Sequence, residues 1–99
     1  MGEPGEPDPV EELIELFLED APMRIEKMVE GLDKQDLEQA RVAAHSLKGS
    51  ARNLGALALS GAAESIEDTI KEEQWDTAKA QLDAVHQQLA ALKDELGKK

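Results

Sequence analysis

DLEQARVAAHSLKGSARNLG (residues 36–55) carries the clearest helical pattern in this chain of 99 residues. Its apolar residues recur at steps of three and four, which is the period of one helix face. They are Leu37, Ala40, Ala44, Leu47, Ala51 and Leu54. Asp36 is a typical N-cap, and Asn53-Leu54-Gly55 supplies a C-terminal stop. The stretch therefore predicts an amphipathic helix that packs one face against neighbouring helices.

Two further helices are predicted before this one. Asp8-Pro9 resembles an N-cap followed by a first-turn proline, and it opens a short helix. Asp20 with Pro22 then restarts the chain into a second helix. Four of residues 1–7 are Gly or Pro, without periodicity, so this segment is predicted to be a flexible linker or an expression remnant. The folded domain is accordingly expected to span residues 8–99.

Two more helices are predicted after it. One follows the apolar stripe between Leu59 and Ile70, and the other begins around Trp75. No segment alternates apolar and polar residues with period two over the length of a strand. The expected fold class is all-α, an antiparallel four-helix bundle with a short additional N-terminal helix.

Composition excludes several classes of function. The formal net charge is −11, which argues against nucleic acid or anionic lipid as the main partner. The chain has no cysteine, so it has no disulfide and no thiolate chemistry. No apolar run approaches the ~20 residues of a membrane span, and residues 1–9 do not resemble a signal peptide. A cytoplasmic protein without membrane contact is expected.

His45 is the candidate functional residue. A rotation of 100° per residue places it about 130° from the centre of the apolar stripe, so its side chain is expected to project into solvent. The residues on its outer side, within two turns, are Arg41, Val42, Lys48, Gly49 and Arg52. Positions 39–63 contain no Asp or Glu, although the chain has 22 acidic residues. An exposed imidazole among cations and without acids suits the binding of an anion.

This arrangement favours phosphoryl chemistry. Imidazole is partly neutral near physiological pH and is then a usable nucleophile. Phosphoryl transfer needs mainly positioning and electrostatic stabilisation, which Lys48 and the two arginines could supply. Gly49 is a poor helix residue and points away from the core stripe, so its expected role is to leave room for a docking partner.

The segment HSLKGSARNLGALALSGAAESIE (residues 45–67) resembles the histidine-containing phosphotransfer (HPt) domain. The family pattern reads roughly H-x-L-K-G-S-x-x-x-L-G-x-x-x-L-x-x-x-C-x-x-L-E. Its matches here are His45, Leu47, Lys48, Gly49, Ser50, Leu54, Gly55, Leu59 and Glu67. Ala63 replaces the frequent Cys, and Ile66 replaces the usual Leu. Neither departure touches the chemistry of the pattern.

The resemblance implies a phosphorelay carrier. In that interpretation His45 is the phosphoacceptor through Nε2, Lys48 contacts the phosphoryl oxygens and Gly49 keeps the approach open. The partners would be response-regulator receiver domains and a sensor histidine kinase, and the receiver would supply Mg²⁺, so no cofactor or metal site is expected on this chain. No ATP-binding motif is present, so kinase activity is not expected. Helix geometry adds Arg41, Val42 and Arg52 as docking residues.

Three other functions are possible for a helical bundle of this kind. A non-catalytic bundle could dock receiver domains without phosphotransfer, and this alternative stays open. A carboxylate-bridged metal bundle needs Glu-x-x-His pairs on two helices, and only Asp83 and His86 have that spacing. A self-contained hydrolase is excluded because a lone exposed histidine without an orienting acid or oxyanion donors is insufficient. His86 has no cation close in sequence and is predicted to be an ordinary surface residue.

Overall fold

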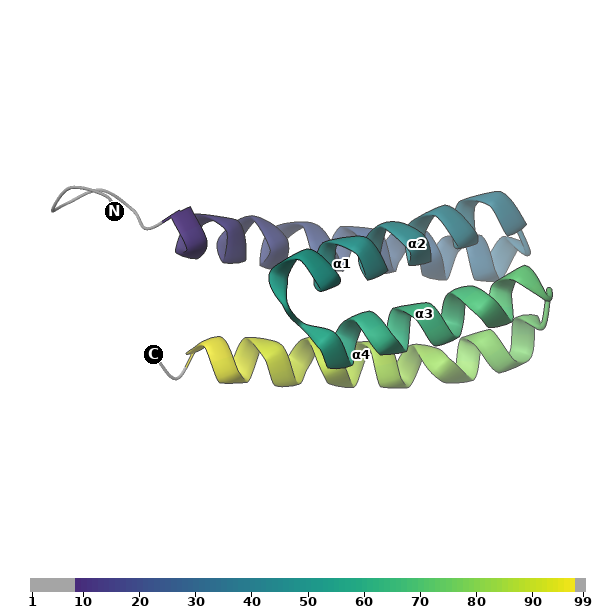
Figure 1. Ribbon diagram of the computed structural model, residues 1–99. Coiled ribbons are helices and arrows are strands. Elements are labelled where there is room, and N and C mark those ends of the chain that lie inside the picture. Colours follow the sequence, from purple (N-terminus) through teal and green to yellow (C-terminus); the bar gives the residue numbers. More distant parts are fainter. Residues whose placement is uncertain (1–8, 98–99) are drawn as a thin grey trace, which may run out of the picture.

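The computed structural model describes residues 9–97, and the side chains of residues 12–95. This part of the chain contains four helices and no strand: α1 (Pro9–Lys34), α2 (Leu37–Leu54), α3 (Leu57–Lys71) and α4 (Trp75–Gly97). The predicted all-α class is confirmed. Successive helices alternate in direction along the long axis of the molecule (Figure 1). The predicted linker at residues 1–7 and the N-cap at Asp8 lie outside the described residues.

The predicted break between two N-terminal helices is wrong. α1 runs through Pro22 without interruption, so the short additional helix is the first half of one 26-residue helix. Proline removes one backbone hydrogen bond, but the buried stripe continues in register across it through Phe17, Ala21, Ile25 and Met28. Packing of both halves on one core outweighs the local penalty. Asp20 forms an ion pair with Arg24 on the same helix.

Both predicted ends of α2 are confirmed. The Asp36 side chain accepts a hydrogen bond of 3.1 Å from the backbone N–H of Gln39. Gly55 ends the helix at φ 84°, in the left-handed region that favours glycine. Its N–H and that of Ala56 bond back to the last carbonyls of α2, at Arg52 and Ala51. A short turn then leads directly into α3, so α2 and α3 pack as neighbouring antiparallel helices.

The core is aliphatic, with small residues where the helices approach most closely. Its largest fully buried side chains include Met28 on α1, Leu47 on α2, Ile66 and Ile70 on α3 and Val85 on α4. α2 contributes mainly alanines to this core: Ala40, Ala43, Ala44 and Ala51. Small side chains let α1 and α3 pack closely against α2, which fixes the helix that carries His45.

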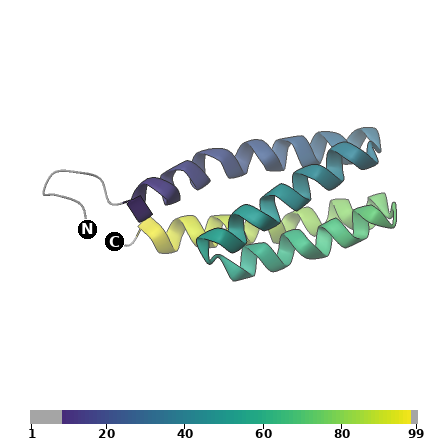
Figure 2. The same ribbon diagram turned by 45° about the horizontal axis from the view of Figure 1, so that its top comes forward.

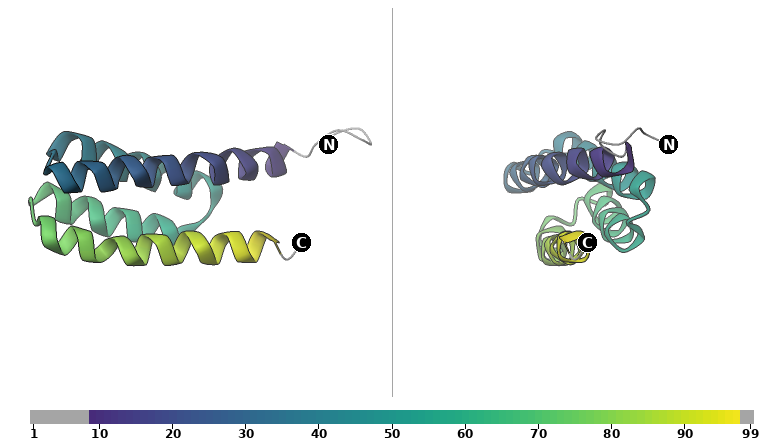
Figure 3. Two further views of the ribbon diagram at one scale, coloured as in Figure 1. Left: turned by 180° about the vertical axis from the view of Figure 1, so that it is seen from behind. Right: turned by 90° about the vertical axis from the view of Figure 1, so that its left-hand side faces the viewer.

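The first and last helices, α1 and α4, are longer than α2. The start of α1 and the end of α4 extend past the α2–α3 turn (Figure 2), and the end-on view separates α1 from α4 (Figure 3). Contacts join α1 to α2, α2 to α3 and α3 to α4, whereas α1 and α4 meet only sparsely. A groove of about 640 Å³ lies between α1 and α4. None of the described helices is long and apolar enough to cross a membrane.

Replacement by alanine is expected to have opposite effects on stability at different helix glycines. A Cβ at Gly31 would lie 2.7 Å from the backbone N of Ala40, whereas a Cβ at Gly49 or Gly61 would meet nothing within 4 Å. Gly31→Ala is therefore expected to lower the free energy of unfolding by about 1–3 kcal/mol, because backbone cannot yield cheaply. Gly49→Ala and Gly61→Ala should each raise it by up to about 1 kcal/mol, because alanine is the better helix former.

Urea denaturation of the three alanine variants measures these effects. A Gly31→Ala variant as stable as the other two would contradict the close approach of α1 and α2. Loss of stability in Gly49→Ala would instead show that position 49 is packed rather than open.

Candidate functional site

His45 lies in the middle of α2, on the edge of the helix that faces α3. Its side chain is 64% exposed, as the helical rotation predicts. The residue before it, Ala44, is fully buried in the core. The imidazole thus stands on a rigid, well-packed helix and presents most of its ring to solvent.

A carboxylate from the neighbouring helix orients this imidazole. Glu67 on α3 places Oε2 3.0 Å from Nδ1 of His45. The Glu67 side chain is only 2% exposed, so it reaches the histidine from within the α2–α3 interface. Ser60 links the same two helices, since its hydroxyl donates to the backbone carbonyl of Lys48 at 3.3 Å. The register between α2 and α3 therefore fixes the positions of His45 and Glu67 relative to each other.

Two lysines share the Glu67 carboxylate. Lys48 Nζ lies 2.8 Å from Oε1, and Lys71 Nζ lies 3.8 Å from Oε2, the oxygen that also faces His45. The Lys48 ammonium lies close enough to Oε1 for a charge-assisted contact. One carboxylate and two ammonium groups leave an excess of one positive charge beside the imidazole.

The charge of Glu67 decides the protonation of the histidine ring. Burial raises the pKa of Glu67, but the contacts with Lys48 and His45 and the charges of Lys48 and Lys71 outweigh this, and its pKa is lowered. Glu67 is therefore ionised at neutral pH and can only accept hydrogen bonds. Nδ1 of His45 must carry the proton in this bond, which leaves the lone pair of the neutral ring on Nε2.

The remaining predicted residues lie around this centre but do not join it. Arg41 pairs with Glu38 on its own helix, with Nη2 3.0 Å from Oε1. Arg52 is exposed, and the described part of the chain offers it no ion pair. Val42 is exposed and lines a shallow depression between α2 and α1, together with Met23. Gly49 has open space where a side chain would project.

The structure corrects the expectation that no acid approaches His45. The acid-free window holds within α2, but α3 brings in Glu67, so the imidazole has an orienting carboxylate. The orienting acid that a hydrolase needs is therefore present, contrary to the expectation from the sequence. In the sequence, Glu67 is the last match of the family pattern, and no pattern singles out Lys71. Of the three cations expected near His45, Lys48 is part of the site, whereas Arg41 is held by Glu38.

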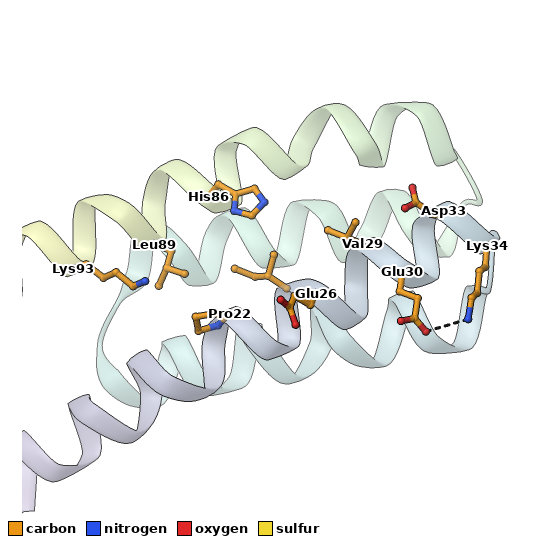
Figure 4. Close-up of a pocket in the computed structure, with 10 residues that line it drawn as sticks. Pro22, Glu26, Val29, Glu30, Asp33, Lys34, His86, Leu89 and Lys93 are labelled. Carbon is orange, nitrogen blue, oxygen red and sulfur yellow. Dashed lines mark hydrogen bonds and ion pairs between the residues drawn. The ribbon is translucent and has the colours of Figure 1, made fainter.

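His86 does not belong to this group of residues. It is exposed on α4 and lines the groove between α4 and α1, opposite Glu26 and Val29 (Figure 4). No described residue forms a hydrogen bond or ion pair with its ring. Its surroundings fit the surface role predicted from the sequence and provide an internal control for His45.

Comparison with known families gives a match over most of the chain. The chain matches the family model of the Hpt domain over residues 12–95, which covers α2, α3 and nearly all of α1 and α4. A comparison with curated proteins and another with solved structures find no match. The match extends well beyond the segment around His45 and includes all four helices. The chain belongs to the Hpt domain family, whose role is histidine phosphotransfer in two-component signalling.

Proposed function

We propose that this chain is a phosphorelay carrier that accepts a phosphoryl group on Nε2 of His45 from a receiver-domain aspartate and passes it to another receiver. The observation that carries the proposal is the hydrogen bond between Nδ1 of His45 and the buried Glu67. It holds the proton on Nδ1 and leaves a nucleophilic lone pair on the exposed nitrogen. A solvated histidine without such a partner would divide its neutral form between two tautomers.

The transfer step follows from this arrangement. The Nε2 lone pair forms a bond to phosphorus while the bond from phosphorus to the aspartyl oxygen breaks, and the aspartate leaves with that electron pair. The ring becomes a phosphoimidazolium whose Nδ1 proton stays in the bond to Glu67. The carboxylate then faces the positive charge that develops on the ring, which stabilises the transition state. Transfer onward reverses the same steps.

Exposed apolar residues line two depressions between α1 and α2, the helix that carries His45. Leu13, Leu16, Met23 and Val42 are large apolar residues with about half of their area exposed. Met23 and Val42 line one depression between α1 and α2, and Leu13 and Leu16 line another with Ser50 and Asn53. Exposed apolar patches of this kind mark interaction sites. In this proposal a receiver domain covers them while its aspartate reaches His45, and the receiver brings any Mg²⁺ that the step needs.

The direct test starts from the unmodified chain. Incubation with phosphorylated receiver domains, and separately with phosphoramidate, should give a phosphoryl group that is stable in base and labile in acid. Mass spectrometry of peptides kept at alkaline pH should locate it on His45. Failure of both donors to modify the chain would refute the carrier and leave the non-catalytic docking bundle as the better interpretation.

Gly49 separates docking from chemistry. Gly49→Gln should fold normally, because a Cβ at this position would meet nothing within 4 Å. Transfer from a receiver should fall by about 10-fold or more, and Gly49→Ala should lose less, because the obstruction grows with side-chain size. Phosphorylation by phosphoramidate should change little, because a small donor needs no docking surface.

Gly61→Ala and Gly61→Gln are the matched controls. Gly61 is an equally open helix position, six residues before Glu67 and thus about 120° around α3 from it. If the Gly61 variants lose as much receiver-dependent transfer as the Gly49 variants, the proposed role of Gly49 in access is wrong.

A further inference from the structure

Lys48 and Lys71 hold the same carboxylate in very different ways. Lys48 Nζ lies 2.8 Å from Glu67, and its side chain is 21% exposed. Lys71 Nζ lies 3.8 Å from Glu67, and its side chain is 51% exposed. The first contact is short and partly buried, whereas the second is long and open to water.

The difference decides which ammonium group is free to move. Glu67 is covered from solvent, and a covered carboxylate without a close cation is strongly destabilising, so Lys48 cannot leave it without loss. The pair between Glu67 and Lys71 is a half-exposed contact at i,i+4 spacing, a type that contributes little to stability. Lys71 can therefore turn to a new anion while Lys48 keeps Glu67 ionised.

The positions of the charged groups favour Lys71 for a phosphoryl group. His45 Nδ1 and Lys71 Nζ approach the same oxygen of Glu67, at 3.0 Å and 3.8 Å, so the imidazole and this ammonium gather around one carboxylate oxygen. α3 runs antiparallel to α2, so Lys71 lies toward the N-terminal half of α2 and Lys48 lies one turn beyond His45 on the other side. Arg41, which precedes His45 by one turn of α2, is already paired with Glu38.

We infer that Lys71 is the cation that binds the phosphoryl group on His45, while Lys48 serves mainly to hold Glu67. This inference rests on the proposed carrier function and departs from the role that the sequence pattern suggests for Lys48. A phosphoryl group on Nε2 adds about two negative charges and three acceptor oxygens to the ring that shares Glu67 with Lys71. The ammonium then exchanges a long contact with Glu67 for charge-assisted hydrogen bonds to phosphoryl oxygens.

The phosphoryl pKa of the modified chain tests this assignment directly. The chain is phosphorylated with phosphoramidate, and its ³¹P signal is titrated by NMR in wild type, Lys71→Gln, Lys71→Arg and Lys48→Gln. A bound cation favours the dianion, so Lys71→Gln should raise the phosphoryl pKa by about half a unit or more, and Lys71→Arg should restore it. Transfer from a receiver should slow by about 3–10-fold in Lys71→Gln without a change in urea midpoint. Lys48→Gln should lower the urea midpoint and move the phosphoryl pKa less.

Lys79→Gln provides the matched control. It removes the same charge from a lysine of similar exposure on α4, where Nζ lies 3.6 Å from Asp33, and it should leave the phosphoryl pKa unchanged. A phosphoryl pKa that is unmoved in Lys71→Gln, or moved more by Lys48→Gln, would overturn the assignment to Lys71 and leave the carrier function intact. Failure of the wild-type chain to form phosphohistidine would overturn both.

Discussion

A His45→Gln chain is expected to carry no phosphoryl group after incubation with a phosphorylated receiver or with phosphoramidate. The amide of glutamine has no basic nitrogen lone pair, so it cannot form the bond to phosphorus. The fold should persist, because the His45 side chain is mostly exposed and makes a single hydrogen bond. Acid-labile label, far-UV circular dichroism and a thermal melt on the same sample measure both halves of this result.

His86→Gln is the matched control for this loss. His86 is the only other histidine of the chain, and it is exposed in the groove between α1 and α4. Its replacement should leave labelling at the wild-type level. Label that persists in His45→Gln, or that is lost in His86→Gln, would contradict the assignment of His45 as the phosphoacceptor.

Most of the fold was accessible from local patterns in the sequence. The ends of α2 follow from the Asp36 side chain and from the left-handed conformation of Gly55, which depend on a few neighbouring residues. The start of α4 at Trp75 is likewise a local signal. The break at Pro22 was mispredicted because its outcome depends on tertiary packing. Pro22 favours a new helix start, whereas the apolar residues on both sides of it favour one continuous helix. Only the packing of the folded core decides for the continuous helix.

The candidate site likewise has some features that the sequence predicts and others that depend on tertiary packing. Exposure of His45 and the open space at Gly49 depend on rotation about one helix axis, so a helical wheel predicts them. Glu67 reaches His45 from another helix, and the wheel of α2 contains no information about the register of α3. A signal was nevertheless present: Glu67 directly follows the fully buried Ile66, so it lies at the boundary of the α3 core stripe. An acid at such a boundary is costly unless it has a partner.

Arg41 has two possible partners at helical spacing. It lies four residues before His45 and three residues after Glu38, and both separations bring side chains together on a helix. The structure pairs it with Glu38, because an acid attracts a guanidinium and an imidazole does not. The excess of positive charge beside His45 therefore comes from Lys48 and Lys71, and the interface between α2 and α3 creates it.

Glu67→Gln is expected to slow phosphorylation of His45 by about 10–100-fold with either donor, by analogy with the loss of a carboxylate that orients a metal-bound histidine. The amide removes the negative charge that faces the developing phosphoimidazolium. It can also present its NH₂ group to the ring, which would place the neutral proton on Nε2 and block the nucleophile. Single-turnover rates with phosphoramidate measure the chemical loss, and ¹⁵N NMR of His45 reports the shift of tautomer.

The same substitution has a pH-dependent effect on stability. The pKa of Glu67 is lower in the folded chain than its ordinary value of 4.5, so its ionised form stabilises the fold above that pH. The contribution is lost as pH falls through the folded pKa. Glu67→Gln should therefore lower the free energy of unfolding by about 1–2 kcal/mol at neutral pH, and the difference from wild type should shrink well below pH 4.5.

Glu64→Gln separates this effect from a general change of charge on α3. Glu64 is exposed one turn before Glu67 and has no ion pair among the described residues, so its amide variant should keep the wild-type rate and stability. Glu67→Asp tests the geometry, because it keeps the charge but shortens the side chain, and it should recover less than the full rate. Equal rates in wild type and Glu67→Gln, with the Nδ1–H tautomer retained, would show that exposure alone makes His45 reactive. The hydrogen bond that carries the proposed function would then have only a structural role.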